Sequence, residues 1–116
     1  MKKITARIGE TLFEAGDKAD AVFFVVSGEI GIFLPTNSSV KPDFILGESE
    51  IFGEMGVISK ALRTGKAVAM TNVNLIKISH HEFNDKLAQA DPFISGLIRI
   101  LVGRISGLIK EKKPLH

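Results

Sequence analysis

The chain has 116 residues, enough for one domain with one core, and its 45% hydrophobic and 24% charged residues argue against disorder over most of its length. Fifteen basic residues against thirteen acidic ones give a net charge of +2, which is too mild to indicate nucleic-acid binding. Cysteine is absent, which excludes disulfides and thiolate chemistry, and there is neither a signal peptide nor an apolar run of membrane-spanning length, so we expect a cytoplasmic protein.

Short strands separated by turns are predicted from about residue 4 to residue 78. Residues 21–26 form a β-branched and aromatic run, and apolar residues alternate in 30–34. The small residues Ser27-Gly28-Glu29 lie between these two runs, so we expect a hairpin here. Residues 35–43 contain two prolines and several small polar residues, which predicts a solvated connection between strands.

Three more strands are predicted after this connection, at residues 44–46, 66–70 and 73–78. Thr71-Asn72 is a candidate tight turn between the last two of them. Several short strands at this spacing indicate a small barrel or a jelly-roll sandwich.

Helices are predicted after the last strand. Ser79 and Glu82 have the spacing of a capping box, which predicts a helix over about residues 80–90. Asp91 followed by Pro92 marks the start of a second helix, which should run to about residue 112.

Apolar residues repeat along the second helix at intervals of four and three, at Ile94, Ile98, Leu101, Ile105 and Leu108. Further apolar residues widen this stripe. Two interpretations remain open: a single core helix, or a helix with a spare apolar face that binds a second copy or another protein.

The segment 51–64, IFGEMGVISKALRT, sets Glu54 between Gly53 and Gly56 and brings Arg63 nine positions later. An arbitrary acid and arginine at this distance would be a solvated surface pair. With an anion present, however, the guanidinium offers a planar fork that matches two phosphate oxygens. A short helix that opens near Glu54 would aim free backbone N–H groups at the same anion.

The order of these parts resembles the cyclic nucleotide-binding domain, the module of catabolite activator proteins, cyclic-nucleotide-dependent kinases and cyclic-nucleotide-gated channels. The resemblance runs from Ile8 to about Leu87 and includes glycines at Gly9, Gly16 and Gly28. Phe52-Gly53-Glu54 and Arg63-Thr64-Gly65 look like the phosphate-binding cassette of that family. The resemblance implies a mainly β fold, a double-stranded β-helix (jelly-roll, β-roll) barrel of about eight strands. It also implies a short helix in the cassette and two C-terminal helices.

The resemblance also implies a role for each cassette residue. Arg63 would bind the cyclic phosphate, and Glu54 would accept a hydrogen bond from the ribose 2′-hydroxyl. Gly53 would let the backbone approach the sugar, and Thr64 would donate its hydroxyl to the phosphate or a purine edge. Met55 and Gly65 would add backbone N–H groups. We expect Arg63→Ala or Arg63→Glu to abolish nucleotide binding while the fold survives. The candidate ligand-binding residues are Gly53, Glu54, Met55, Arg63, Thr64 and Gly65.

Four positions depart from the family pattern, among them Lys66, where a small hydroxyl residue is common, and Phe23, where tyrosine is often found. Gly65 stands where alanine is usual, and Ser49 stands where glycine is often found. None of these departures removes the phosphate site, although base selectivity is left open. Ser95, Arg99 and Ser106 are the candidate readers of the base, and we favour cyclic AMP over cyclic GMP as the ligand.

We therefore expect residues 1–116 to form a single regulatory domain, a freestanding sensor that is not an enzyme and that signals through movement of its C-terminal helices. The alternative is a degenerate roll that binds no nucleotide and acts through protein contacts. A cupin-type metal enzyme would need clustered histidines in its strands, and His80, His81 and His116 do not supply them. A DNA-binding regulator would need a recognition helix that this sequence lacks.

Overall fold

The computed structural model describes residues 1–101, apart from the side chains of Met55 and Ser59. The part of the second predicted helix beyond residue 101, with the seam residues Ile105 and Leu108 and the candidate base reader Ser106, lies outside the described residues.

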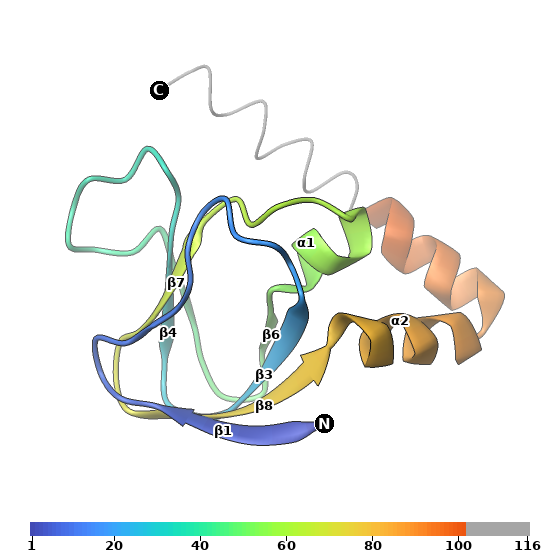
Figure 1. Ribbon diagram of the computed structural model, residues 1–116, viewed down its shortest axis with the longest axis horizontal. Coiled ribbons are helices and arrows are strands. Elements are labelled where there is room, and N and C mark those ends of the chain that lie inside the picture. Colours follow the sequence, from blue (N-terminus) through green and yellow to red (C-terminus); the bar gives the residue numbers. More distant parts are fainter. Residues whose placement is uncertain (102–116) are drawn as a thin grey trace.

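Eight antiparallel strands form two four-stranded sheets that face each other across one core (Figure 1). The first sheet has the order β1 (Lys2–Ala6), β8 (Val73–Ser79), β3 (Ala21–Ser27) and β6 (Ile51–Phe52). The second has the order β2 (Thr11–Phe13), β7 (Lys66–Ala69), β4 (Ile30–Phe33) and β5 (Phe44–Leu46). This is the mainly β jelly-roll architecture that the resemblance implies.

The predicted hairpin at Gly28 is wrong, and the turn at Thr71-Asn72 does not join paired strands either. β3 and β4 belong to different sheets, and so do β7 and β8. Each short turn therefore carries the chain from one sheet to the other. β4 does pair with β5, so residues 34–43 connect neighbouring strands as expected.

The two sheet-to-sheet corners contact each other closely. Gly28 has a φ of +94°, and a Cβ there would lie 2.5 Å from both the Asn72 carbonyl oxygen and Val73 Cγ1. The Glu29 N–H donates to Thr71 Oγ1 at 3.0 Å, and the Met70 N–H donates to the Glu29 carbonyl at 2.9 Å. Only glycine combines this backbone conformation with this close approach.

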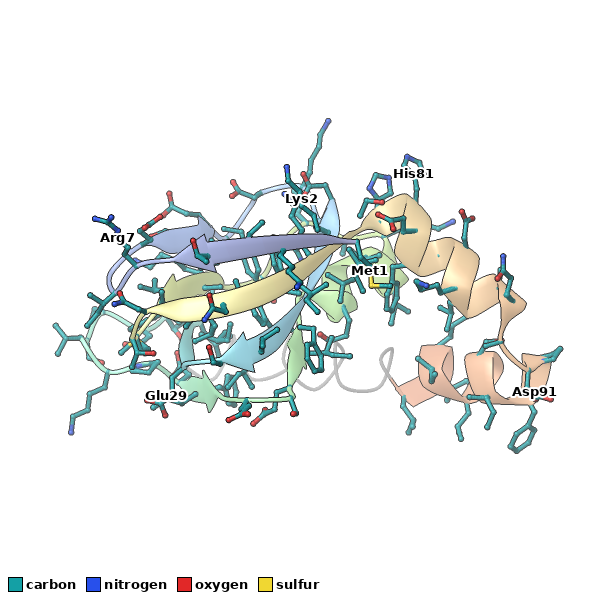
Figure 2. All side chains as sticks on the ribbon, turned by 90° about the horizontal axis from the view of Figure 1, so that it is seen from below. Met1, Lys2, Arg7, Glu29, His81 and Asp91 are labelled. Carbon is teal, nitrogen blue, oxygen red and sulfur yellow. The ribbon has the colours of Figure 1, made fainter. Side chains whose placement is uncertain are left out.

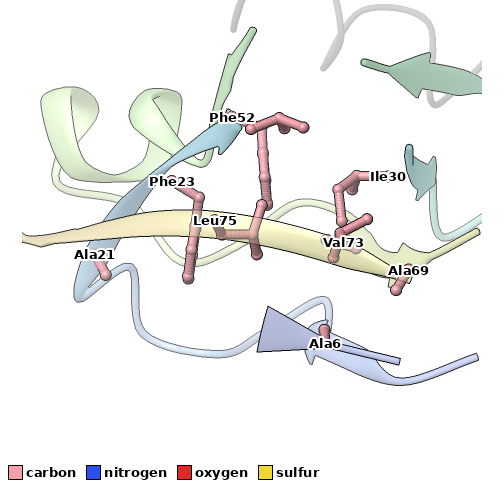
Figure 3. Close-up of a cluster of buried hydrophobic side chains, with 10 residues drawn as sticks. Ala6, Ala21, Phe23, Ile30, Phe52, Ala69, Val73 and Leu75 are labelled. Atoms are coloured by element: carbon pink, nitrogen blue, oxygen red, sulfur yellow. The ribbon is translucent and has the colours of Figure 1, made fainter. Parts of the chain in front are cut away.

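The core lies between the sheets and is built from alternate residues of the strands (Figure 3). Its largest fully buried members include Ile30, Val25 and Leu75. The N-terminal strand β1 was not expected to begin before residue 4, yet it starts at Lys2 and pairs with β8 over its whole length. Ala6 from β1 is 5% exposed and joins the core cluster.

Two helices lie at the same end of the roll, α1 (Glu54–Ser59) and α2 (His80–Gln89) (Figure 1). Ser79 is the N-cap as predicted, because the Glu82 N–H donates to Ser79 Oγ at 3.2 Å, and the Ser79 hydroxyl in turn donates to the Glu82 carboxylate at 3.3 Å. The chain is helical again over residues 92–101, where Asp91 Oδ1 accepts from the Phe93 N–H at 2.9 Å. Figure 2 shows Arg7 and Glu29 at the opposite end of the roll from His81 and these helices.

Apolar side chains of residues 92–101 remain well exposed, with Phe93 at 76% and Ile100 at 55%. None of the helices within residues 1–101 has both the length and the apolar character needed to cross a bilayer.

Candidate functional site

Arg63 is held at its backbone by the turn between β2 and β3. Its N–H donates to the Asp17 carbonyl and its own carbonyl accepts from the Gly16 N–H, both at 2.8 Å. This two-sided pairing sends the side chain inward, and Arg63 is only 5% exposed.

The guanidinium of Arg63 joins three elements. Nη1 donates to the Gly53 carbonyl and Nη2 to the Ala21 carbonyl, each at 2.5 Å. The Cζ atom lies over the Phe13 ring, 4.2 Å from its centroid. Nε is buried, and it has no hydrogen-bond partner among the residues that the structure describes.

The glycines on either side of Glu54 make room for this arrangement. Gly53 is the N-cap of α1 with a φ of +85°, and a Cβ there would lie 2.9 Å from Arg63 Nη1. A Cβ on Gly56 would come within 2.6 Å of Ala19 Cβ. Both glycines therefore allow α1 to lie against the arginine and the 17–20 segment. The sequence suggested a different reason for Gly53, the approach of the sugar, and that role stays a prediction.

Burial disfavours the charged form of both Glu54 and Arg63. Burial raises the pKa of Glu54 above its ordinary value, although its own backbone N–H and the charge of Arg63 act in the other direction. Burial also lowers the pKa of Arg63, against the negative charges of Asp20, Glu54 and Asp17. Arg63 makes no salt bridge to Glu54, since main-chain carbonyls take its two terminal nitrogens.

α1 begins without a side-chain cap, because its N-cap is Gly53. The N–H groups of the first turn of a helix have no intrahelical acceptor. The Glu54 N–H already interacts with its own carboxylate, which leaves the Met55 N–H as the candidate donor to a ligand. After Arg63, the half-buried Thr64 and the buried Gly65 lead into β7. A Cβ on Gly65 would lie 3.0 Å from the Phe33 carbonyl oxygen, so the glycine that replaces the usual alanine fits against β4.

The structure thus brings Gly53, Glu54 and Arg63 together at the first turn of α1. Sequence analysis missed two members of this site, the Phe13 ring and the Ala21 carbonyl. The aromatic residue in the run TLF is a visible signal, but it also has the ordinary explanation of a core residue. No sequence signal marks a main-chain carbonyl.

A groove of about 740 Å³ lies elsewhere, on the outer face of the second sheet. Lys66, Val68, Ala69 and Met70 line it from β7 and the residue after it, whereas the buried Ala67 of the same strand does not. None of the cassette residues borders this groove. Within residues 1–101, no cluster of three or more histidine, aspartate or glutamate side chains is placed to hold a metal ion.

Comparison with curated proteins finds relatives of several kinds. The chain is 31% identical over 107 residues to lysophospholipase nte1 of Neurospora crassa, covering 89% of this chain and 7% of that protein. It is 25% identical over 103 residues to the CRP-like cAMP-activated global transcriptional regulator of Mycobacterium tuberculosis, covering 84% of this chain and 44% of the regulator. The chain therefore spans less than half the length of either relative.

Comparison with solved structures finds the EAL enzyme Bd1971 in two liganded forms. Its cAMP-bound form superposes with a TM-score of 0.80 at 27% identity, covering 97% of this chain and 30% of that one. Its cGMP-bound form superposes with a TM-score of 0.83 at 26% identity, covering 95% and 30%.

The family match agrees with the two sheets, the short cassette helix and the buried arginine. Residues 3–90 match the family described as the cyclic nucleotide-binding domain, which is most of the chain. The chain therefore belongs to the cyclic nucleotide-binding domain family.

Proposed function

We propose that this domain binds a cyclic nucleotide through Gly53, Glu54, Met55, Arg63, Thr64 and Gly65. The observation that carries the proposal is Arg63, a cation that is 5% exposed and whose buried Nε has no partner within the described part of the chain. A buried N–H donor without an acceptor costs free energy, about 1–3 kcal/mol, and an arriving anion would satisfy it.

The N–H donors that remain on the Arg63 guanidinium match the oxygens of a phosphodiester. A guanidinium has five N–H donors, and two of them are committed to the carbonyls of Gly53 and Ala21. Nε and the second N–H of Nη2 lie on one edge of the guanidinium, which can bind two oxygens of a monoanionic phosphate. The backbone N–H groups of Met55 and Gly65 and the hydroxyl of Thr64 would complete the phosphate shell.

Glu54 supplies the acceptor that the sugar needs. Its carboxylate lies at the start of α1, one residue from the Gly53 carbonyl that holds Arg63. The charged form accepts the 2′-hydroxyl, so the site would reject a 2′-deoxy ligand by leaving a half-buried carboxylate without this partner.

We favour cyclic AMP as the natural ligand, and cyclic GMP as the second choice. The mycobacterial relative is named as cAMP-activated, and Bd1971 has been solved with either nucleotide.

The domain would bind and not catalyse. Its output would be movement of the helical segment after Asp91, whose exposed apolar residues could then bind a second copy or another protein. Amide hydrogen exchange in this segment should slow when nucleotide is added, and unchanged exchange would remove the segment from the response.

Thermal unfolding with and without nucleotide tests the proposal. A ligand at one hundred times its Kd adds roughly 2.7 kcal/mol to the free energy of unfolding, which raises the Tm of a domain this size by several degrees. Cyclic AMP and cyclic GMP should do this, whereas linear 5′-AMP should not. Arg63→Lys keeps the charge but loses the two-oxygen edge, so it should reduce the shift.

The degenerate alternative predicts another outcome. A chain that unfolds cooperatively yet shows no Tm change with millimolar cyclic AMP or cyclic GMP would contradict the proposed function. The protein-interaction role would then be the better explanation.

A further inference from the structure

Among residues 1–101, Phe13 is the side chain whose aromatic face contacts the Arg63 guanidinium, with Cζ 4.2 Å from the ring centroid. The residue ends β2, and it is half-buried. No role for it follows from the cassette motif, which begins at Phe52.

The two hydrogen bonds of Arg63 restrain one motion of the guanidinium less than the others. They run from Nη1 to the Gly53 carbonyl and from Nη2 to the Ala21 carbonyl, so both acceptors lie on the terminal nitrogens. Tilting the guanidinium plane about the line between these nitrogens changes the two bonds little, but it changes the direction in which Nε points. A flat surface against the plane opposes this tilt.

The Phe13 ring is itself held in place by two other aromatic rings. Its centroid lies 6.1 Å from the centroid of Phe23 and 6.1 Å from that of Phe52. Those two rings stack on each other at 4.9 Å with an interplanar angle of 13°. Phe23 and Phe52 are 5% and 2% exposed, so the ring under the guanidinium rests on rigid core.

We infer that Phe13 is a positioning residue for nucleotide binding, which fixes the tilt of the Arg63 guanidinium and aims its Nε edge at the phosphate. The inference rests on the proposed function. It assigns to β2 a part in anion recognition that acts wholly through Arg63. A cation over an aromatic face in a desolvated site gains enough for the loss of the ring to lower affinity by roughly 5- to 30-fold.

Calorimetric titration of the full chain with cyclic AMP tests this with three variants. Phe13→Leu keeps an apolar side chain but removes the aromatic face, and Phe13→Tyr keeps the face. Phe24→Leu is the matched control, since Phe24 is the next aromatic residue on β3 after Phe23 and points to the opposite side of the sheet. Phe13→Leu should bind roughly 5- to 30-fold more weakly, while the other two should bind within about 2-fold of wild type.

Two further readouts separate positioning from a general loosening of the fold. Phe13→Leu should weaken cyclic AMP and its 2′-deoxy analogue by the same factor, because the sugar contact of Glu54 is not involved. In nitrogen-15 spectra without nucleotide, the Arg63 Nε–H signal is identified by its loss in Arg63→Lys. A ring current should shift this signal upfield, and the shift should vanish in Phe13→Leu.

The outcomes are distinct. Wild type that binds neither cyclic nucleotide refutes the proposed function. Wild type that binds while Phe13→Leu binds equally well refutes the positioning role alone. An equal loss in Phe24→Leu, a changed 2′-deoxy ratio, or an Arg63 signal that is the same in Phe13→Leu would also refute it.

Discussion

Arg63 stabilises the fold as well as the proposed site. Its side chain ties the N-cap of α1 to the start of β3 through two main-chain carbonyls. Its two terminal nitrogens are paired with main-chain dipoles in place of a carboxylate, while Nε has no partner within the described residues. The expectation that the fold survives replacement of Arg63 by alanine stays a prediction, and these contacts add a stability cost to it.

Arg63→Ala should lower the free energy of unfolding by roughly 2–4 kcal/mol, because two interior carbonyls lose their donors and a cavity is left beside Phe13. Urea denaturation gives this value. The exposed Arg7→Ala is the control and should change stability by less than about 0.5 kcal/mol. An Arg63→Ala protein as stable as wild type would show that the guanidinium does not hold these elements together.

Glu54 should make stability depend on pH in a defined direction. Burial raises its pKa above the ordinary value of 4.5, so the folded protein keeps this proton to a higher pH than the unfolded chain does. Folding then takes up a proton between the two pKa values, and the contribution of Glu54 to stability falls as pH rises through that window.

Glu54→Gln cannot titrate, so its stability relative to wild type should improve as pH rises from about 4 to about 7. Urea titrations of both proteins across this range measure the difference, in which the other titrating groups cancel. A difference that stays flat with pH would mean that Glu54 has the same pKa in both states. Nucleotide binding provides a second check, since discrimination against 2′-deoxy ligand should weaken as Glu54 takes up its proton.

At the level of elements, sequence reasoning located five of the eight strands by residue range, and it took two corners between the sheets for turns between paired strands. The alternation of Ile30 and Ile32 and the turn at Gly28 predict a strand, a turn and a strand, and all three are present. The same local signals describe a hairpin and a corner between sheets, since both need an abrupt reversal and a residue with positive φ. Only the non-local pairing of β4 with β7 and of β3 with β8 decides between them.

The candidate site shows the same limit. Glu54, Arg63 and the glycines were found because the cassette motif is contiguous. The Ala21 carbonyl and the Phe13 ring come from segments far from the motif, and they meet Arg63 only because β2 and β3 lead to the same end of the roll. Ser49 illustrates a departure that the structure explains, for its φ of +70° is the conformation that glycine adopts more easily.

Gly28→Ala and Gly9→Ala separate two reasons for a glycine in a turn. One is a positive φ, and the other is the lack of space for a Cβ. Both residues have nearly the same φ, +94° and +89°, but a Cβ on Gly9 meets nothing within 4 Å. Gly9→Ala should therefore cost only the conformational strain, roughly 1–2 kcal/mol. Gly28→Ala adds a collision with Asn72 and Val73 and should cost at least about 2 kcal/mol more. Equal losses in urea denaturation would contradict the close contact of the two corners.

Within residues 1–101, the molecule divides into a roll that holds the core cluster and a helical segment, residues 92–101, that adds no member to that cluster. Every member of the core cluster lies between Ala6 and Leu75, and α2 adds the buried Leu87. By contrast, Phe93, Leu97 and Ile100 are 76%, 44% and 55% exposed. The family match ends at residue 90, which is also the C-cap of α2. We therefore expect folding and ligand capping to depend on different parts of the chain.

A chain that ends at Ala90 tests this division. It should unfold in one cooperative urea transition within about 1 kcal/mol of the full chain, because no member of the core cluster is removed. Leu87→Ala in the full chain is the contrasting variant, since it empties a buried position of α2 and should cost roughly 2–5 kcal/mol. Affinity for cyclic AMP should fall in the shortened chain, because the candidate base readers Ser95 and Arg99 are removed while Arg63 and Glu54 remain. Loss of the cooperative transition would show that the segment after Ala90 belongs to the folding unit, and unchanged affinity would show that it does not cover the ligand.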